Sequence, residues 1–255
     1  MKSTYTALFL SLLIFSCTNN PRNSSMANIK DAPKAKQMTK ELSMHDDVRQ
    51  DEFYWLNERE NPEVIAYLEA ENAYYDSNTA HTKDFQTALF EEMKSRIKKD
   101  DSSVPYKYNG YWYITRYEKG KDYPVYTRKK ETLSAKEELL FDCNEMAKGH
   151  AYFNLKGLNI SPDNSLVAFA TDTIGRRQYN LYIKNLKTNK ILEDKVGNST
   201  GSSTWANDNK TLFYTLQNET TLRSEAIYKH TIGSNTKDDA LVYEEKDDTF
   251  GVGVY

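Results

Sequence analysis

The residues Gly197-Asn-Ser-Thr-Gly201 match the G-x-S-x-G pattern in which a Ser hydroxyl attacks an acyl carbon. That chemistry needs a buried strand before the Ser and a helix after it, because the sharp turn between them exposes the hydroxyl. Here the charged run Glu193-Asp-Lys195 precedes the motif, and polar residues lead into a strand after it. A triad in the order Ser, Asp, His would also have to fit within Asp208 and His230. We therefore interpret Ser199 as part of a turn between two repeated units, not as a nucleophile.

Metal and cofactor chemistry have no matching pattern. The four histidines stand at no spacing typical of a metal site, so we interpret them as solvated or locally hydrogen-bonded. The segment Gly251-Val-Gly253 lacks the third glycine and the helix of a dinucleotide-binding loop. We expect no catalytic, metal-binding or cofactor-binding residue in this chain. The histidines are His45, His81, His150 and His230.

The loop Asp172-Thr-Ile-Gly-Arg-Arg-Gln-Tyr179 places two guanidinium groups beside a glycine turn. Arg suits a bidentate contact with a carboxylate at an interface. Arg176 and Arg177 are therefore candidates for a contact with another domain or an acidic group. The alternative is a solvated loop between two strands.

The first 17 residues have the pattern of an export signal. Lys2 precedes the apolar run Ala7 to Phe15, which is too short to span a bilayer, and Ser16-Cys17 follow. A small residue and a Cys after such a run resemble a bacterial lipobox, so Cys17 is the predicted lipid attachment site. We expect export to the periplasm or membrane anchoring through this lipid alone. The alternatives are plain export, or a cytoplasmic protein that starts at Met26.

Residues 18–44 follow as a predicted tether, because Asn, Ser, Lys and Ala dominate most of this stretch. Once Cys17 is set aside, Cys143 is the remaining thiol and no intramolecular disulfide can form. Cys143 ends the apolar run Leu139-Leu-Phe-Asp-Cys143, so we expect it to be a buried packing residue.

The composition fits a folded chain with a modest core and a heavily solvated surface. Apolar residues make up 38% and charged residues 28%, and the net charge is −3. Nothing in this balance indicates a nucleic-acid partner or a polybasic membrane surface. The 19 tyrosines favour strands.

The segment from Leu158 to Ile232 contains two copies of one sequence repeat. Each copy has an Asp-Asn turn, a strand of apolar and small residues, a polar loop and a second strand, and Asp163 and Asp208 stand about 45 residues apart. That period is typical of a four-stranded propeller blade, and such sheets must stack on neighbours to bury both faces. The sequence predicts blades at about 104–146, 150–196 and 202–245, with 250–255 as a strand that enters a fourth. We expect the front part of a longer protein, because three blades do not close a ring.

Residues 51–99 change to a helical period. Asn61 can cap a helix that starts at Pro62 and ends near Thr79. A second helix is predicted from near Asp84, with apolar residues at steps of four from Phe85 to Ile97. These two helices need a partner surface.

Several long motifs in order resemble the oligopeptidase B branch of the prolyl oligopeptidase family of serine peptidases. They are Asp51 to Arg59, Pro62 to Asn72, Thr115 to Pro124, Asp172 to Tyr179, Leu222-Arg-Ser224 and Glu244 to Phe250. The resemblance implies a mainly β chain with part of a seven-bladed propeller, about three blades and the start of a fourth. It further implies that residues 45–100 form a helical segment that packs on an α/β-hydrolase domain, while residues 101–255 form the incomplete propeller.

In this family the Ser nucleophile, its Asp and His partners and the acidic specificity residues follow the propeller, so the resemblance assigns no catalytic residue to this chain. It implies an enzyme that cleaves short basic peptides after Lys or Arg, with the propeller restricting access. This chain alone is expected to be inactive without the C-terminal hydrolase domain. The alternative is a non-enzymatic propeller lipoprotein that acts as a binding module.

Overall fold

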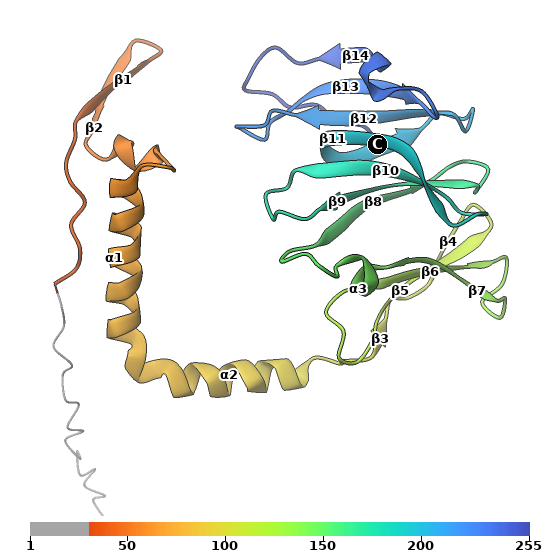
Figure 1. Ribbon diagram of the computed structural model, residues 1–255, viewed down its shortest axis with the longest axis horizontal. Helices are drawn as coiled ribbons and strands as arrows, with labels where there is room; N and C mark the ends of the chain where they lie inside the picture. The colour runs from red at the N-terminus through yellow and green to blue at the C-terminus, as the bar shows by residue number, and fades with distance from the viewer. Residues whose placement is uncertain (1–30) are drawn as a thin grey trace, which may run out of the picture. The chain divides into compact units, whose positions relative to one another are not determined.

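The structure is a computed structural model that describes residues 31–255 (Figure 1). The predicted signal segment and its lipid attachment site Cys17 lie outside the described residues. The contacts divide the chain after Arg96 into two compact units. No helix among the described residues is both long enough and apolar enough to cross a bilayer.

The N-terminal unit begins with a hairpin of β1 (Lys40–Met44) and β2 (Asp47–Asp51), which pair in antiparallel register. Its two-residue turn has positive φ at both His45 and Asp46, the geometry that matches the twist of the flanking strands. The predicted tether reached residue 44, so the structure corrects its last five residues from tether to strand. Trp55, in the short helix η1 (Tyr54–Asn57), is buried, and its indole N–H donates to the carbonyl of Lys36 at 2.8 Å.

Two helices follow the hairpin. The side chain of Asn61 accepts a hydrogen bond from the backbone N–H of Glu63, and Pro62 occupies the first helical position of α1 (Pro62–Thr79). The single turn η2 (Ala80–Thr82) leads into α2 (Lys83–Arg96). The predicted bounds of α1 are confirmed. The second helix starts one residue before the predicted Asp84 but ends at Arg96, so Ile97, the last apolar residue of its predicted stripe, lies outside it. The apolar stripe of α2 is exposed, with Phe85 at 68% and Met93 at 53% of full exposure.

The first blade is an antiparallel sheet in the order β3-β5-β6-β7, with β4 paired to β5. Its strands are β3 (Asp101–Ser102), β4 (Tyr106–Tyr108), β5 (Tyr111–Tyr117), β6 (Val125–Lys130) and β7 (Glu137–Asp142), and the short α3 (Cys143–Met146) follows. We call this sheet blade 1. It confirms the strands predicted between residues 104 and 146.

A second sheet of seven antiparallel strands runs in the order β14-β13-β12-β11-β10-β9-β8. Its strands are β8 (Asn154–Ile160), β9 (Leu166–Asp172), β10 (Tyr179–Asn185), β11 (Lys190–Trp205), β12 (Thr211–Gln217), β13 (Ser224–Thr231) and β14 (Ala240–Glu244), and η3 (Thr236–Asp238) precedes β14. The first half of β11 pairs with β10 and its second half with β12. Blade 2 is therefore β8 to β10 with the first half of β11, and blade 3 is the second half of β11 with β12 to β14.

The long strand β11 corrects the predicted turn at Ser199. The backbone bends within the strand, where Asn198 has φ 52° and Gly201 has φ 79°, and the register shifts between Ser199 and Ser203. A bulge of this kind redirects a strand without ending it. The chain thus passes from blade 2 to blade 3 without leaving the sheet.

The repeated turns form as predicted. Asp208 accepts backbone hydrogen bonds from Lys210 and Thr211 at 2.9 and 2.8 Å, and Asp163 accepts one from Ser165 at 3.0 Å. The residue after each Asp has positive φ, a conformation that Asn tolerates. By contrast, residues 250–255 form no regular strand, although the backbone N–H of Val252 donates to the carbonyl of Ser224 at 3.0 Å. The entry of this segment into a fourth blade stays a prediction.

Two apolar clusters join successive blades. One combines Tyr113, Leu140 and Phe141 of blade 1 with Ile160, Val167 and Phe169 of blade 2. The other combines residues of β9, β10 and β11 with Leu212 and Tyr214 of blade 3. Full burial of one such side chain stabilises the fold by about 1.5–3 kcal/mol. The stacking of sheets through these clusters confirms a propeller-type arrangement.

Candidate functional site

The β9–β10 loop, residues 173–178, presents the two predicted arginines in a fixed backbone. Asp172 at the end of β9 is only 1% exposed, and its carboxylate accepts backbone hydrogen bonds from Ile174, Gly175 and Arg177 at 2.8, 3.0 and 2.7 Å. Arg177 itself has φ 59°. One buried carboxylate therefore sets the shape of the whole loop.

The same loop is tied to the next blade. The side-chain amide of Gln217 donates to the carbonyl of Arg177 at 2.8 Å, and that of Gln178 donates to the carbonyl of Glu219 at 3.2 Å. The side chains of Arg176 and Arg177 are exposed, and within residues 31–255 neither makes a hydrogen bond or a salt bridge. The loop thus offers two unpaired cations on a rigid base, which suits a contact with a carboxylate.

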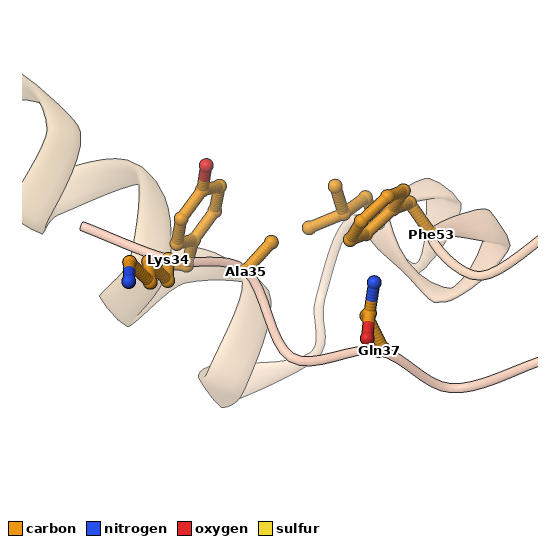
Figure 2. A pocket seen from close by; sticks show the side chains of 6 residues that line it. Lys34, Ala35, Gln37 and Phe53 are labelled. Atoms are coloured by element: carbon orange, nitrogen blue, oxygen red, sulfur yellow. The ribbon is translucent and has the colours of Figure 1, made fainter. Parts of the chain in front are cut away.

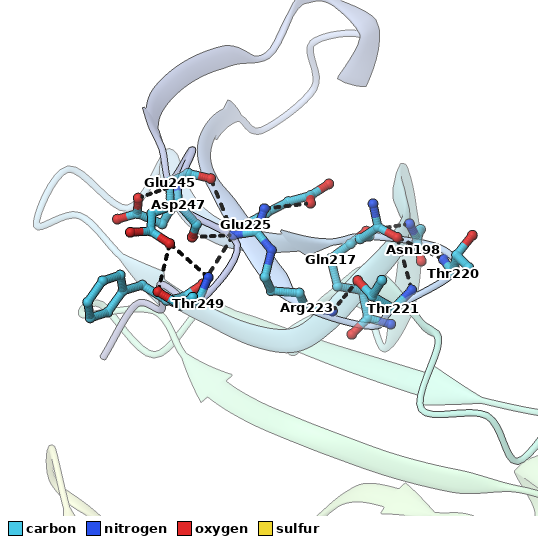
Figure 3. A network of polar contacts seen from close by, with 11 residues as sticks. Asn198, Gln217, Thr220, Thr221, Arg223, Glu225, Glu245, Asp247 and Thr249 are labelled. Carbon is cyan, nitrogen blue, oxygen red and sulfur yellow. Dashed lines mark hydrogen bonds and ion pairs between the residues drawn. The ribbon is translucent and has the colours of Figure 1, made fainter. Parts of the chain in front are cut away.

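Arg223 organises the neighbouring part of blade 3, at the start of β13 (Figure 3). Its Nη1 donates to the backbone carbonyls of Glu245, Asp247 and Phe250 at 3.3, 3.4 and 3.1 Å, while Nη2 lies 3.3 Å from Oε2 of Glu225. One guanidinium therefore shapes the segment that follows β14. The sequence alone does not mark this role, because the carbonyls that Arg223 contacts lie more than 20 positions away.

The segment after β14 adds fixed negative charge. Hydrogen bonds from the backbone N–H of Asp247 and from the hydroxyl of Tyr243 lower the pKa of Glu245. Hydrogen bonds from the hydroxyl and backbone N–H of Thr249 lower the pKa of Asp247. Both carboxylates stay ionised at neutral pH, so the chain carries fixed acidic groups after β14 and fixed basic groups in the β9–β10 loop.

The G-x-S-x-G motif has no catalytic geometry. Ser199 is fully buried within β11, its hydroxyl donates to the carbonyl of Tyr179 at 3.1 Å, and it accepts from the backbone N–H of Gly201 at 3.2 Å. Both ring nitrogens of His230 lie against carboxylates, of Asp194 and Asp239, so neither is free to act as a base for Ser199. The hydroxyl bonds only to backbone groups and stabilises the bend in β11.

The remaining candidates are structural. Cys143 is 1% exposed, and burial raises the pKa of its thiol to about 12, which keeps it protonated and inert. His45, His81 and His150 are exposed as expected, whereas His230 is buried, so the solvated interpretation was wrong for that residue. Residues 31–255 hold no group of His, Cys, Asp and Glu side chains suited to a metal ion.

The N-terminal unit contains an open hollow of about 700 Å³. Figure 2 shows Lys34, Ala35, Gln37 and Phe53 around it, and Leu56 and Tyr67 complete the lining. The lining mixes apolar and polar groups with one cation and has no pair of groups arranged for acid–base or nucleophilic chemistry. Its chemistry favours packing over catalysis.

Comparisons with known proteins agree with the propeller architecture. Residues 32–255 match the family model described as "Prolyl oligopeptidase, N-terminal beta-propeller domain". Among curated proteins, dipeptidyl aminopeptidase BI of Pseudoxanthomonas mexicana is 40% identical over 267 residues, which cover 98% of this chain and 37% of that protein. Protease 2 of Moraxella lacunata is 35% identical over 225 residues, which cover 86% of this chain and 32% of that protein. The chain thus spans about a third of the length of these relatives.

Two solved structures show the same arrangement. Oligopeptidase B from Leishmania major superimposes with a TM-score of 0.78 at 28% identity, covering 88% of this chain and 34% of that one. Oligopeptidase B from Trypanosoma brucei with covalently bound antipain gives 0.76 at 27% identity, with the same coverage of 88% and 34%.

Proposed function

The chain belongs to the prolyl oligopeptidase family of serine peptidases, and from this membership we propose that it is the N-terminal part of an oligopeptidase that cleaves short peptides after Lys or Arg. The observation that carries the proposal is the match of residues 32–255 to the propeller domain of this family, together with the likeness to two oligopeptidase B structures. In this proposal the chain supplies the propeller blades and the N-terminal helices of the enzyme. The nucleophile and its partners are expected in a C-terminal hydrolase domain.

The propeller's role in this proposal is to restrict access. Val167 and Leu212 are completely buried between successive blades, so the joints between blades are closed to solvent. A ring built from such joints admits substrate only through its openings, which pass short peptides and exclude folded proteins.

The proposed partner of the N-terminal helices is the hydrolase domain. The apolar stripe of α2 continues to Ile97, just after the helix. Its large side chains are at 41–68% of full exposure. An exposed stripe of this size is typical of a helix that packs on another surface. We assign the same partner to Arg176 and Arg177, whose unpaired guanidiniums suit a carboxylate of that domain. The stripe consists of Phe85, Leu89, Phe90, Met93 and Ile97.

A second candidate activity has its own support. The relative with 40% identity over 98% of this chain bears the name dipeptidyl aminopeptidase BI. In that case the full enzyme would release dipeptides from the amino ends of peptides. The two candidates share the family chemistry and differ in the position of the cleaved bond.

We further propose that the protein is exported and carries a lipid on Cys17. Export with a lipid on Cys17 is supported by the sequence pattern alone, since Cys17 lies outside the described residues. The membrane contact proposed is this lipid anchor.

The experiment is to sequence the gene beyond the codon for Tyr255, express the complete product and assay it on two reporters. One reporter is blocked at its amino end and carries Lys or Arg at the cleaved bond, and the other is a dipeptide amide with a free amino end. Cleavage of the blocked reporter supports the oligopeptidase, and cleavage of the dipeptide amide alone supports the aminopeptidase. A product without a strand–Ser–helix motif that cleaves neither reporter contradicts both and favours a binding module.

A further inference from the structure

Lys184 and His230 occupy the same position in two successive blades. Lys184 on β10 lies opposite Val167 on β9, and His230 on β13 lies opposite Leu212 on β12. Val167 and Leu212 are about 45 positions apart, which is the period of the repeat. Both basic side chains are buried, at 9% and 1% exposure.

Lys184 reaches from blade 2 to blade 1. Its ammonium donates to the carbonyl of Leu140 on β7 at 2.6 Å and lies 4.6 Å from the centre of the Phe141 ring. Burial lowers the pKa of this ammonium, and no carboxylate of the described chain forms a salt bridge with it. Its described polar partner is thus a backbone carbonyl in the outer strand of the preceding blade.

His230 reaches from blade 3 to blade 2. Its Nε2 lies 2.8 Å from a carboxylate oxygen of Asp194 on β11, and its Nδ1 lies 2.7 Å from one of Asp239. The three side chains are 1%, 6% and 2% exposed. The same oxygen of Asp194 accepts from the backbone N–H of Gly233 at 2.6 Å, and the other oxygen of Asp239 accepts from the hydroxyl of Tyr214 at 2.8 Å.

Each of the two short contacts of His230 needs a proton to be a hydrogen bond. A neutral imidazole has one N–H, so one of the two short contacts would then face a lone pair on the nitrogen with a lone pair on the carboxylate. Two hydrogen bonds need two protons, and the arrangement that supplies them with both carboxylates ionised is an imidazolium. Such buried charges are stable only when each one is paired and hydrogen-bonded, as these are.

We propose that this position is a strut between blades, in which a basic side chain on the third strand of one blade donates to the outer strand of the blade before it. Lys184 fastens blade 2 to blade 1 through a carbonyl, and the His230 imidazolium fastens blade 3 to blade 2 through Asp194. The apolar clusters stabilise the stacking of the sheets, but the hydrophobic effect is not directional. A buried hydrogen bond also fixes how one sheet lies on the other.

Blade 1 contains a matched control. Lys129 on β6 lies opposite Trp112 on β5. Trp112 stands three residues after a positive-φ Asn, and so do Val167 and Leu212 in their blades. Its described contacts stay within blade 1, where the ammonium donates to the carbonyl of Leu133 at 3.1 Å and lies 3.9 Å from Oε2 of Glu137. It has the same residue type and position as Lys184 without a contact to another blade.

The first test is nitrogen-15 NMR of the histidine rings in the full 255-residue chain at pH 7. The strut predicts one His with protons on both ring nitrogens, and this signal disappears in His230→Gln. A neutral His230 ring, with one nitrogen unprotonated, would overturn the proposal for blade 3. Because this measurement uses the unaltered chain, it tests the protonation of His230 even where a variant fails to fold.

The second test is a pair of double-mutant cycles read from urea unfolding. His230→Gln with Asp194→Asn is expected to show a coupling of at least tenfold in the unfolding constant, about 1.4 kcal/mol. The control cycle, Lys129→Gln with Glu137→Gln, is expected to show less than about threefold, because that pair is longer and partly exposed. Equal coupling in the two cycles refutes a special role for His230.

Lys184 has a backbone partner, so hydrogen exchange replaces the cycle. Lys184→Met is expected to speed exchange of the β7 amides beside Leu140 by at least about threefold, while Lys129→Met leaves them unchanged. Unchanged exchange in Lys184→Met removes the strut between blades 1 and 2.

Discussion

The joint between blades 2 and 3 makes the sharpest stability prediction, through Gly157 on β8. A Cβ at this position would lie 2.0 Å from the carbonyl oxygen of Gly201 on β11, and the backbone has φ 67°. Real Cβ contacts essentially never fall below 3.0 Å, so Gly157→Ala forces the two backbones apart by about 1 Å. The inner strands of two blades meet here, and both are held by hydrogen bonds such as Trp205 Nε1 to the carbonyl of Asn159 at 2.9 Å.

Two costs add at Gly157 and can be separated. An L residue with positive φ costs about 1–2 kcal/mol, and overpacking of a tight contact costs about 1–3 kcal/mol more. Gly110 is the matched control, because it has φ 79° and a Cβ there meets nothing within 4 Å. We expect Gly157→Ala to lower the free energy of unfolding by about 2–5 kcal/mol and Gly110→Ala by about 1–2 kcal/mol.

Urea denaturation at pH 7, followed by tryptophan fluorescence, measures both variants. Trp205 lies in the joint, so its signal also reports a local opening that precedes global unfolding. Equal losses of unfolding free energy in the two variants, within about 0.5 kcal/mol, would refute the backbone contact between β8 and β11 as the source of the extra cost at Gly157.

Three further predictions concern other parts of the chain. Backbone hydrogen bonds from Lys210 and Thr211 hold the pKa of Asp208 below its ordinary value of 3.8. The contribution of this carboxylate to stability is therefore full above pH 3.8 and is lost as the pH falls through the lowered pKa. Unfolding curves of Asp208→Asn and of the native chain should differ at pH 7 and converge in acid. A difference that stays constant with pH contradicts this. Asp172→Ala leaves three loop N–H groups without their buried acceptor and should cost about 2–4 kcal/mol in urea, with faster exchange confined to the β9–β10 loop; a loss below about 0.5 kcal/mol would show that the loop holds its shape without it. Metabolic palmitate labelling of the exported protein should vanish in Cys17→Ser, and labelling that persists excludes Cys17 as the attachment site.

Local signals in the sequence predicted much of the fold. The Asn61 cap and Pro62 fix the start of α1, and Asp163 and Asp208 each bond to the backbone two residues ahead. These interactions close within a few residues, so residue type and spacing suffice to find them. The period of the repeat then predicts the stacked sheets.

The errors lie where distant residues decide the outcome. Ser199 was expected in a turn, but pairing with Tyr179 on one side and Leu216 on the other keeps it in β11. His230 was expected to be solvated or locally bonded, yet Asp194 lies 36 positions away. No spacing rule links such positions, because the fold alone brings them together.

The candidate site was predicted in part. Arg176 and Arg177 are exposed on a loop, as expected, whereas the buried carboxylate of Asp172 that shapes this loop was not recognised. The role of Arg223 was missed because its acceptors are backbone carbonyls, which no residue type marks. A contact of the two loop arginines with a hydrolase domain stays a prediction.

We propose that residues 31–255 provide the propeller and helical segment of a peptidase and do not carry out its catalysis. The direct measurement is hydrolysis of a blocked Lys- or Arg-terminated reporter peptide by the purified 255-residue chain and by Ser199→Ala. We expect no turnover by either protein, because the Ser199 hydroxyl is buried and bonded to backbone groups. Turnover by the native chain that Ser199→Ala abolishes would contradict this proposal and place a nucleophile inside the propeller.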